Sequence, residues 1–325
     1  MRLGWPKKRV KNITCSTSGK LFFSVCLYQV SRAIKDFHMR RAVIDIGTNT
    51  VKLLVADVHD GSIRPVASKD RTTRLGEGLD QSNRLSRAAV ARTIQAIDEF
   101  LNEAQRLGAQ NVLALATSAS REAENRDEFL EAVRRQCGLE VQVITGAREA
   151  GLIFRGVSSD PEWSSQPILV LDVGGGSAEF IQGRGDEVEQ FQSLSLGAVR
   201  LTEQHGENYG ALVESVRQTL HRSLDGYSAR NRMMIGTGGT ITTLARIEHG
   251  MTDHASLSRE QLRALVDRLR ALPLAERKKV PGLPPERADI IVAGGAVFLV
   301  AMEMLDATKL TVSIRNLRYG ALVAN

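Results

Sequence analysis

A short pattern occurs twice in this 325-residue chain, and it constrains the fold more than any other feature. Residues 43–50 read VIDIGTNT, and residues 170–177 read VLDVGGGS. In both copies an apolar run carries an aspartate near its end, then a glycine, and then a hydroxyl residue five positions after the aspartate. An apolar run that ends at glycine is typical of a strand followed by a tight turn. The repeat therefore indicates two related halves.

Each copy of the pattern opens a similar series of predicted elements. In the first half, three strands are followed by helices and strands in alternation, in the order βββαβαβα. A polar, proline-bounded segment at residues 161–167 then separates this series from a second one. We expect an α/β protein of two domains, at residues 39–163 and 164–313, with a cleft between them.

The net charge of +6 belongs to an extension at the start of the chain. Residues 1–38 contribute +7, so the remaining residues are close to neutral and give no indication of a nucleic-acid partner. Met39 directly precedes the first predicted strand, and we expect residues 1–38 to lie outside the fold. The alternative is a targeting leader, because the segment has a basic start and a short apolar run.

Cysteine content and hydropathy indicate a cytoplasmic protein. Cys15 and Cys26 lie in the extension, which leaves Cys137 alone in the body of the chain. A single cysteine makes no internal disulfide, and this favours a reducing compartment. The chain has no apolar run of about 20 residues, so we expect no membrane span.

The glycine turns predict a phosphate-binding site. Glycine lets the backbone approach a ligand closely, and its neighbours add hydroxyl and amide donors. A third glycine run, residues 236–240, lies between a predicted strand and a helix whose amino terminus favours anions. A plain hairpin would explain one such turn, but three turns favour phosphate. The predicted phosphate-binding residues of these turns are Gly47, Thr48, Asn49, Thr50, Gly174, Gly175, Gly176, Ser177, Gly236, Gly238 and Gly239.

Two aspartates in the repeated pattern are the predicted metal ligands. Asp45 and Asp172 carry the same charge as phosphate, so they cannot bind it directly. Their expected role is to hold Mg²⁺ or Mn²⁺, directly or through water, and the ion then neutralises the phosphates. Potassium is an additional candidate ion.

The chain also resembles a known family, the exopolyphosphatases and guanosine pentaphosphate phosphohydrolases of the actin-like ATPase superfamily. The resemblance rests, in order, on residues 116–125, 145–150, 172–177 and 195–202. It extends from Met39 to the carboxyl end and is closest to the short, two-domain form. It implies an actin-like (ribonuclease H-like) fold in which the last helix, at about 314–325, packs back on the first domain.

The resemblance also implies roles for residues near the predicted turns. Glu149 matches the family's general base, Arg121 its phosphate-contacting arginine, and Thr117 belongs to the phosphate-binding segment. Some relatives have a catalytic glutamate where this chain has Ser118, and Glu122, one helical turn later, is the expected substitute. Ser118 is then expected to contact phosphate, and Arg74 to engage the substrate chain or to remain a loop charge.

The leading functional hypothesis is hydrolysis of the terminal phosphate of inorganic polyphosphate. Guanosine pentaphosphate is the alternative substrate, because it presents the same terminal anhydride. An ATP-dependent kinase and a non-catalytic sensor of nucleotide or polyphosphate are alternatives of other classes. No nucleic-acid or membrane partner is expected, and the sequence is compatible with a homodimer.

Overall fold

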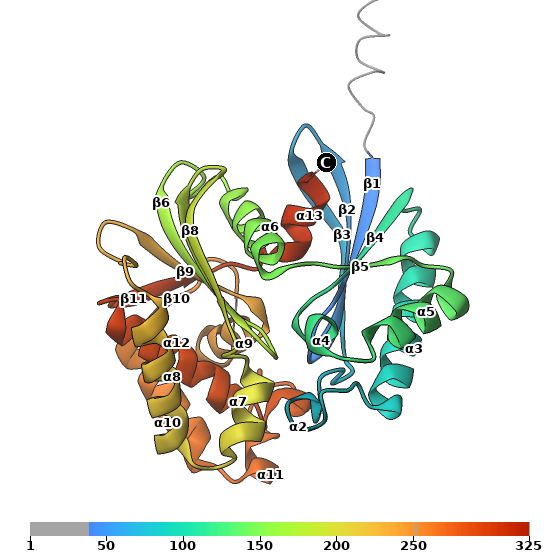
Figure 1. Cartoon of the computed structure of the whole chain (residues 1–325). Coiled ribbons are helices and arrows are strands. Elements are labelled where there is room, and N and C mark those ends of the chain that lie inside the picture. The colour runs from blue at the N-terminus through green and yellow to red at the C-terminus, as the bar shows by residue number, and fades with distance from the viewer. Residues whose placement is uncertain (1–38, 251, 325) are drawn as a thin grey trace, which may run out of the picture. The chain divides into compact units, whose positions relative to one another are not determined.

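Two mixed β-sheets, one from each half of the chain, form the framework of the protein (Figure 1). The computed structural model describes residues 39–250 and 252–324. The predicted extension at residues 1–38 therefore lies outside the described residues. None of the helices within the described ranges is long and apolar enough to cross a membrane.

The first sheet has the strand order β3-β2-β1-β4-β5. Its strands are β1 (Met39–Ile46), β2 (Thr50–His59), β3 (Ser62–Thr72), β4 (Asn111–Ala116) and β5 (Val141–Val143). β1, β2 and β3 form an antiparallel meander, whereas β4 pairs with β1 in parallel. The register of the first hairpin places Lys52 opposite Asp45, so the two side chains share one face of the sheet.

The helices of the first half follow local sequence signals. They are α2 (Leu79–Ser82), α3 (Arg87–Arg106), α4 (Ser118–Glu122), α5 (Arg126–Cys137) and α6 (Gly146–Ser158). The Ser86 side chain accepts a hydrogen bond from the amide of Ala89 and so caps α3, and Gly138 ends α5 in the left-handed conformation. α3 and α5 bury their apolar faces on one side of the first sheet.

The second sheet repeats the order of the first and adds one strand at its edge, giving β10-β11-β9-β6-β7-β8. Its strands are β6 (Pro167–Val173), β7 (Ala178–Arg184), β8 (Glu187–Leu194), β9 (Met233–Thr237), β10 (Ser256–Ser258) and β11 (Lys309–Val312). The remaining helices are α7 (Ala198–His205), α8 (Tyr209–Ser223), α9 (Gly238–His249), α10 (Arg259–Ala271), α11 (Leu274–Arg277), the 3₁₀ turn η1 (Pro285–Arg287), α12 (Ile291–Met304) and α13 (Leu317–Val323). The predicted α/β class with a duplicated βββαβαβα unit is confirmed.

Helices α6 and α13 lie side by side between the two sheets (Figure 1). α6 packs against β7 and β8 of the second sheet, and α13 packs against β1 and β2 of the first. A Cβ atom at Gly156 would overlap the carbonyl oxygen of Asn316, and one at Gly320 would overlap that of Leu152. Glycine at both positions therefore allows the two helix backbones to touch.

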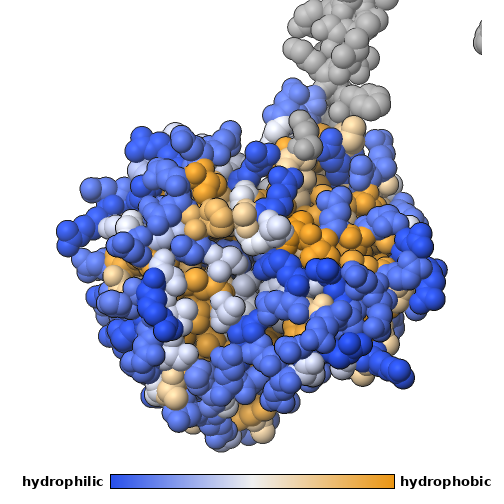
Figure 2. All heavy atoms as spheres, viewed as in Figure 1, coloured by the Kyte–Doolittle hydropathy of each residue, from blue (hydrophilic) through white to orange (hydrophobic). Residues whose placement is uncertain are grey.

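Apolar side chains from both sheets surround this helix pair. On the face shown in Figure 2, hydrophilic residues predominate at the periphery and apolar residues gather towards the middle. The buried core itself lies between the sheets as well as beneath the outer helices.

The segment at residues 161–167, predicted as a polar linker, is a compact turn with an apolar anchor. Trp163 is 1% exposed, and its Nε1 donates a hydrogen bond to the carbonyl oxygen of Val157 at 2.8 Å. The ring of His254 packs edge-on against the indole. His254 also contacts Asp160 at 2.9 Å, Glu162 at 2.8 Å and Asp253 at 3.9 Å, and Arg315 lies 3.4 Å from the same Asp160 oxygen.

Candidate active site

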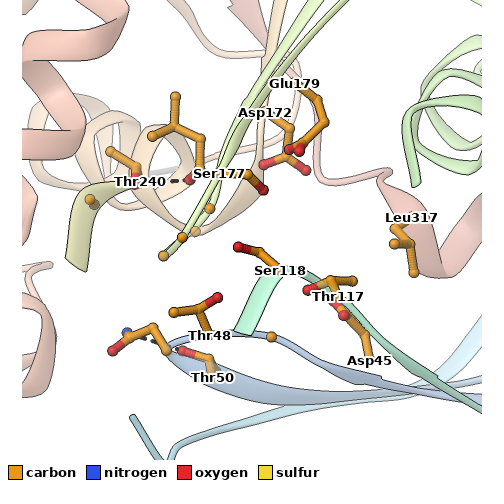
Figure 3. A pocket seen from close by; sticks show the side chains of 18 of the residues that line it. Asp45, Thr48, Thr50, Thr117, Ser118, Asp172, Ser177, Glu179, Thr240 and Leu317 are labelled. Atoms are coloured by element: carbon orange, nitrogen blue, oxygen red, sulfur yellow. Dashed lines mark hydrogen bonds between the residues drawn. The ribbon is translucent and has the colours of Figure 1, made fainter. Parts of the chain in front are cut away.

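The two glycine turns of the repeated pattern meet at one small cavity, with a volume of about 80 Å³ (Figure 3). Both turns close with the same backbone hydrogen bond, from Gly47 N to Thr50 O at 3.1 Å and from Gly174 N to Ser177 O at 2.9 Å. The predicted residues that line this cavity are Asp45, Gly47, Thr48, Asn49, Thr50, Thr117, Ser118, Glu149, Asp172, Gly174, Gly175, Gly176, Ser177 and Gly239.

The turns are in contact across the cavity. A Cβ atom at Gly176 would overlap Ser118 Oγ and would lie 2.7 Å from Thr48 Oγ1. Figure 3 shows Thr48 and Ser118 of the first half opposite Ser177 of the second. Thr48 Oγ1 and Asn49 Oδ1 are buried without a hydrogen-bond partner among the described residues. Buried polar atoms are rarely left unpaired, so these two atoms indicate a place for a polar ligand.

Glu149 is held in the cavity wall by its position in a helix and by one cation. It lies in the first turn of α6, which Thr145 caps by accepting a hydrogen bond from the amide of Arg148. Arg121 Nη1 donates to Glu149 Oε2 at 2.5 Å and to the Ile144 carbonyl oxygen at 3.1 Å. Burial raises the pKa of Glu149 to about 7, although the charge of Arg121 opposes this shift. Arg121 does not line the cavity but fixes the carboxylate that does.

Glu122, the predicted substitute for the glutamate of some relatives, does not line the cavity. Its Oε1 accepts a hydrogen bond from Ser118 Oγ at 2.7 Å, and its Oε2 lies 2.5 Å from Arg200 Nη2. Arg200 belongs to the second half and also pairs with Asp80. These partners direct Glu122 away from the centre of the site.

Glu179, which the sequence analysis missed, lines the cavity instead. It is 2% exposed and its Oε1 accepts a hydrogen bond from Ser193 Oγ at 2.8 Å. Burial and the nearby charge of Glu149 raise its pKa well above the ordinary value. Side chains two positions apart on a strand share a face, so the place of Glu179 two residues after Ser177 is the signal that could have revealed it.

Asp45 and Asp172 line the same cavity, and Lys52 lies with them. Burial raises the pKa of Asp45, and that of Asp172 to about 6, whereas the positive charge of Lys52 opposes both shifts. Burial is also the main cause of a lowered pKa at Lys52. Lys52 was not predicted as a site residue, yet the predicted first hairpin could have revealed it, because Lys52 pairs with Asp45 across the turn.

The donor atoms of the cavity fit a hard divalent cation. The carboxylate oxygens of Asp45 and Asp172 are ligands of the type that Mg²⁺ and Mn²⁺ prefer. Within the described ranges no three or more His, Cys, Asp or Glu side chains are grouped closely enough to hold a metal ion by themselves. Mg²⁺ normally uses one or two carboxylates and completes its coordination with water and substrate phosphates, so two aspartates suffice for such a site.

Three predicted phosphate-binding residues lie outside the cavity. Arg74 Nη1 contacts Asp289 at 2.7 Å, and this ion pair links the two halves. Gly236 lies in β9, where apolar side chains of the second core surround it. Gly238 has φ +88°, and a Cβ atom there would overlap the Asp172 carboxylate, so it makes room for the aspartate.

The structure adds further residues to the cavity wall that the sequence analysis missed. Arg287, in the turn η1, is 9% exposed, and a Cβ atom at Gly239 would overlap its Nη1. No periodic pattern marks Arg287 in the sequence. The other lining residues not predicted are Ile153, Val173, Ala198, Thr240, Ile290, Asn316 and Leu317.

Comparison with known proteins places this chain in a family. The chain is 33% identical over 301 residues to exopolyphosphatase 1 of Mycobacterium tuberculosis, with 88% of each protein covered. It is 32% identical over 293 residues to a guanosine-5'-triphosphate,3'-diphosphate pyrophosphatase of Vibrio atlanticus. That match covers 86% of this chain but 58% of the Vibrio enzyme.

Solved structures give the same result. The Aquifex aeolicus member of the Ppx/GppA family is 32% identical with a TM-score of 0.73, covering 88% of this chain and 96% of that one. An exopolyphosphatase from Cytophaga hutchinsonii is 27% identical with a TM-score of 0.79, covering 87% and 96%. The family model for Ppx/GppA phosphatases matches residues 54–325. The chain therefore belongs to the Ppx/GppA phosphatase family.

Proposed function

We propose that this protein is an exopolyphosphatase, which hydrolyses the terminal phosphate of inorganic polyphosphate with Mg²⁺ or Mn²⁺ and releases orthophosphate. The observation that carries the proposal is the cavity where the two glycine turns meet beside Glu149. Its wall combines a positioned carboxylate with buried polar atoms of Thr48 and Asn49 that have no hydrogen-bond partner within residues 39–250 and 252–324. The similarity to an exopolyphosphatase across 88% of both chains supports this substrate class.

In the proposed reaction, the terminal phosphate lies between the two glycine turns. Glu149 accepts a proton from a water molecule while the water oxygen attacks the terminal phosphorus. The bond from that phosphorus to the bridging oxygen breaks, and the bridging oxygen leaves with the shortened chain. The products are orthophosphate and a polyphosphate one unit shorter. Arg121 acts on Glu149, which its hydrogen bond keeps in one orientation.

Asp45 and Asp172 would hold the divalent ion, which neutralises charge on the phosphates when bound. We assign Glu179 as the second carboxylate of the site, because it lines the cavity while Glu122 is held by Ser118 and Arg200. With this assignment, Glu179 supplies the second carboxylate that some relatives have at the position of Ser118. Its expected contribution is a hydrogen bond to the attacking water or to the terminal phosphate.

Phosphate release by the purified full-length chain tests the proposal. Long-chain polyphosphate, guanosine pentaphosphate and ATP are compared at equal concentrations of terminal phosphate, with Mg²⁺ and with chelator. Metal-dependent release mainly from polyphosphate is the expected result. Release mainly from guanosine pentaphosphate would assign the chain to that alternative, and release from none of the three would refute a hydrolytic role.

A further inference from the structure

The second glycine turn is attached to the start of α7 through its carbonyl groups. The Gly174 carbonyl oxygen accepts a hydrogen bond from the amide of Ala198 at 2.9 Å. The Gly175 carbonyl oxygen accepts from the amides of Val199 at 2.9 Å and Arg200 at 3.2 Å. The first amides of a helix have no partner within the helix, so the turn supplies the acceptors that these amides need. The position of α7 therefore fixes the orientation of the turn.

The amides of the turn point away from α7 as a result. The carbonyl and the amide of one trans peptide unit point in opposite directions, and the carbonyls of residues 174–176 are all directed at α7 and its N-cap residue. The opposed amides belong to Gly175, Gly176 and Ser177, which line the small cavity. Within the described ranges, none of these three amides donates to a backbone carbonyl in a turn, loop or helix cap. They are therefore available to a phosphate oxygen.

Arg200 extends this attachment to the first half of the chain. Its Nε donates to the Gly176 carbonyl oxygen at 3.0 Å. Its Nη2 lies 2.5 Å from Glu122 Oε2 on α4, and its Nη1 pairs with Asp80 on α2. Asp80 Oδ2 also accepts from Gln204 Nε2 of α7 at 2.7 Å. Only 12% of the Arg200 side chain is exposed, so salt screens these charges less than it screens a pair on the surface.

The contacts of Arg200 end at two groups that meet in the small cavity. One is Gly176, and the other is Ser118, whose Oγ donates to Glu122 Oε1 at 2.7 Å. A Cβ atom at Gly176 would overlap Ser118 Oγ, so the two groups are in close contact. Both residues line the cavity, whereas Arg200 and Glu122 do not. Arg200 thus joins the two sides of the cavity wall from behind.

We propose that Arg200 is a positioning residue, which holds the amides of the second glycine turn and the hydroxyl of Ser118 in one arrangement around the terminal phosphate. This inference rests on the proposed function. Arg200 acts through Gly176 and Glu122 and does not touch the phosphate itself. Glu122 is then an anchor for Arg200 and not a second catalytic carboxylate. Because charge on the terminal phosphate changes in the transition state, a loss of this arrangement lowers kcat more than it weakens substrate binding.

Arg200→Gln tests the inference in the full-length chain, with long-chain polyphosphate and Mg²⁺. We expect kcat to fall about tenfold, the usual scale for one hydrogen bond to a charged group, while KM changes by about threefold at most. This split between kcat and KM separates a positioning role from a purely structural one. A structural role would lower the urea midpoint of the variant and leave kcat of its folded fraction unchanged.

Arg232→Gln is the matched control for the loss of an arginine ion pair. Arg232 Nη2 lies 2.5 Å from Glu189 Oε2, and 20% of its side chain is exposed, so its pairing resembles that of Arg200. Both residues belong to the second half, and neither lines the small cavity. We expect this variant to keep the wild-type kcat.

Glu122→Gln and the double variant Arg200→Gln/Glu122→Gln identify the route of the effect. Since both residues act in one chain of contacts, the double variant should lose no more kcat than Arg200→Gln alone. Losses that multiply in the double variant would overturn the inference, as would a kcat of Arg200→Gln equal to that of Arg232→Gln or a loss confined to KM. Absence of phosphate release by the wild-type chain would instead refute the proposed function, so the two failures are distinguishable.

Discussion

The two glycine turns share one backbone design but differ in what they offer a ligand. The first turn presents side chains, and two of its polar atoms, Thr48 Oγ1 and Asn49 Oδ1, are buried and have no hydrogen-bond partner in the part of the chain that the structure describes. The second presents three glycines; a Cβ atom at Gly176 would overlap Ser118 Oγ, and one at Gly175 would lie only 3.0 Å from the backbone nitrogen of Asn49. The two turns thus have the same backbone closure, but the first supplies more side-chain contacts and the second supplies closer backbone approach.

Each half also supplies one glutamate to the cavity, and substituting these glutamates should have the largest effect. Glu149 reaches the cavity on a helix of the first half and Glu179 on a strand of the second. We expect Glu149→Gln to lower kcat by about a hundredfold or more, because it removes the general base that we propose. Glu179→Gln should cost less, about tenfold, since it removes one hydrogen bond in the site.

Steady-state phosphate release measures both effects, with Glu140→Gln as an exposed control on the loop before β5. Equal loss in the two active-site variants would show that the halves contribute equally to the chemistry. An unchanged rate in Glu149→Gln would remove Glu149 from the mechanism.

A methyl group in the second turn should separate the two turns. Gly176→Ala places a Cβ atom on Ser118 Oγ and close to Thr48 Oγ1, so the turns must move apart. Because misplacement by about 1 Å can cost on the order of a hundredfold, we expect kcat/KM to fall between tenfold and a hundredfold. Gly151→Ala on α6 is the control, since nothing lies within 4 Å of its added Cβ atom. Equal activity of the two variants would show that close approach of the turns is not required.

The pH profile tests the environment of Glu149. Its pKa is raised to about 7 by burial, and the base acts only when deprotonated, so kcat/KM should rise about tenfold from pH 6 to pH 8. Arg121 lowers this pKa through its charge and hydrogen bond, so Arg121→Gln should move the rise to higher pH. Comparing the two proteins on the same substrate cancels the ionisation of the substrate. Superimposed profiles would contradict the assignment of the titration to Glu149.

The smallest expected effect lies where the two halves join. The carboxylate of Asp160 raises the pKa of His254 above its ordinary 6.5. The histidine therefore stabilises the fold fully below pH 6.5, and this stability is lost as pH rises through the raised pKa. We expect the urea midpoint of the wild type to fall towards that of His254→Gln between pH 6 and pH 8.5. A constant difference between the two proteins would show that His254 does not titrate in this range.

The fold was largely predictable, because repeated glycine turns and alternating apolar runs are local signals. The α/β class, the duplicated unit and the family are confirmed. β10 was not predicted, because an edge strand of three residues carries little hydrophobic pattern. The separate helix α8 was not predicted either, because the short break before Asn208 interrupts the helical pattern too little to be recognised.

The site was predictable only as far as local spacing reaches. Helical spacing correctly brings Glu122 to Ser118, but Arg200, a partner from the other half, decides where its carboxylate points. Arg287 enters the cavity from an irregular turn whose position depends on tertiary packing. Arg74, predicted to engage the substrate chain or to remain a loop charge, pairs with Asp289 across the halves, a contact that no local pattern indicates. Contacts between distant segments have no periodic signature, so they cannot be predicted from the pattern of a single sequence.

The touching backbones of α6 and α13 also bear on the spacing of the two sheets. α6 lies against the second sheet and α13 against the first, and the glycines at their crossing leave no side chain between them. A side chain at either glycine would push the two helices apart, and with them the two sheets on which the helices pack. We therefore expect the spacing of the two glycine turns to depend on Gly156 and Gly320, which do not line the cavity themselves.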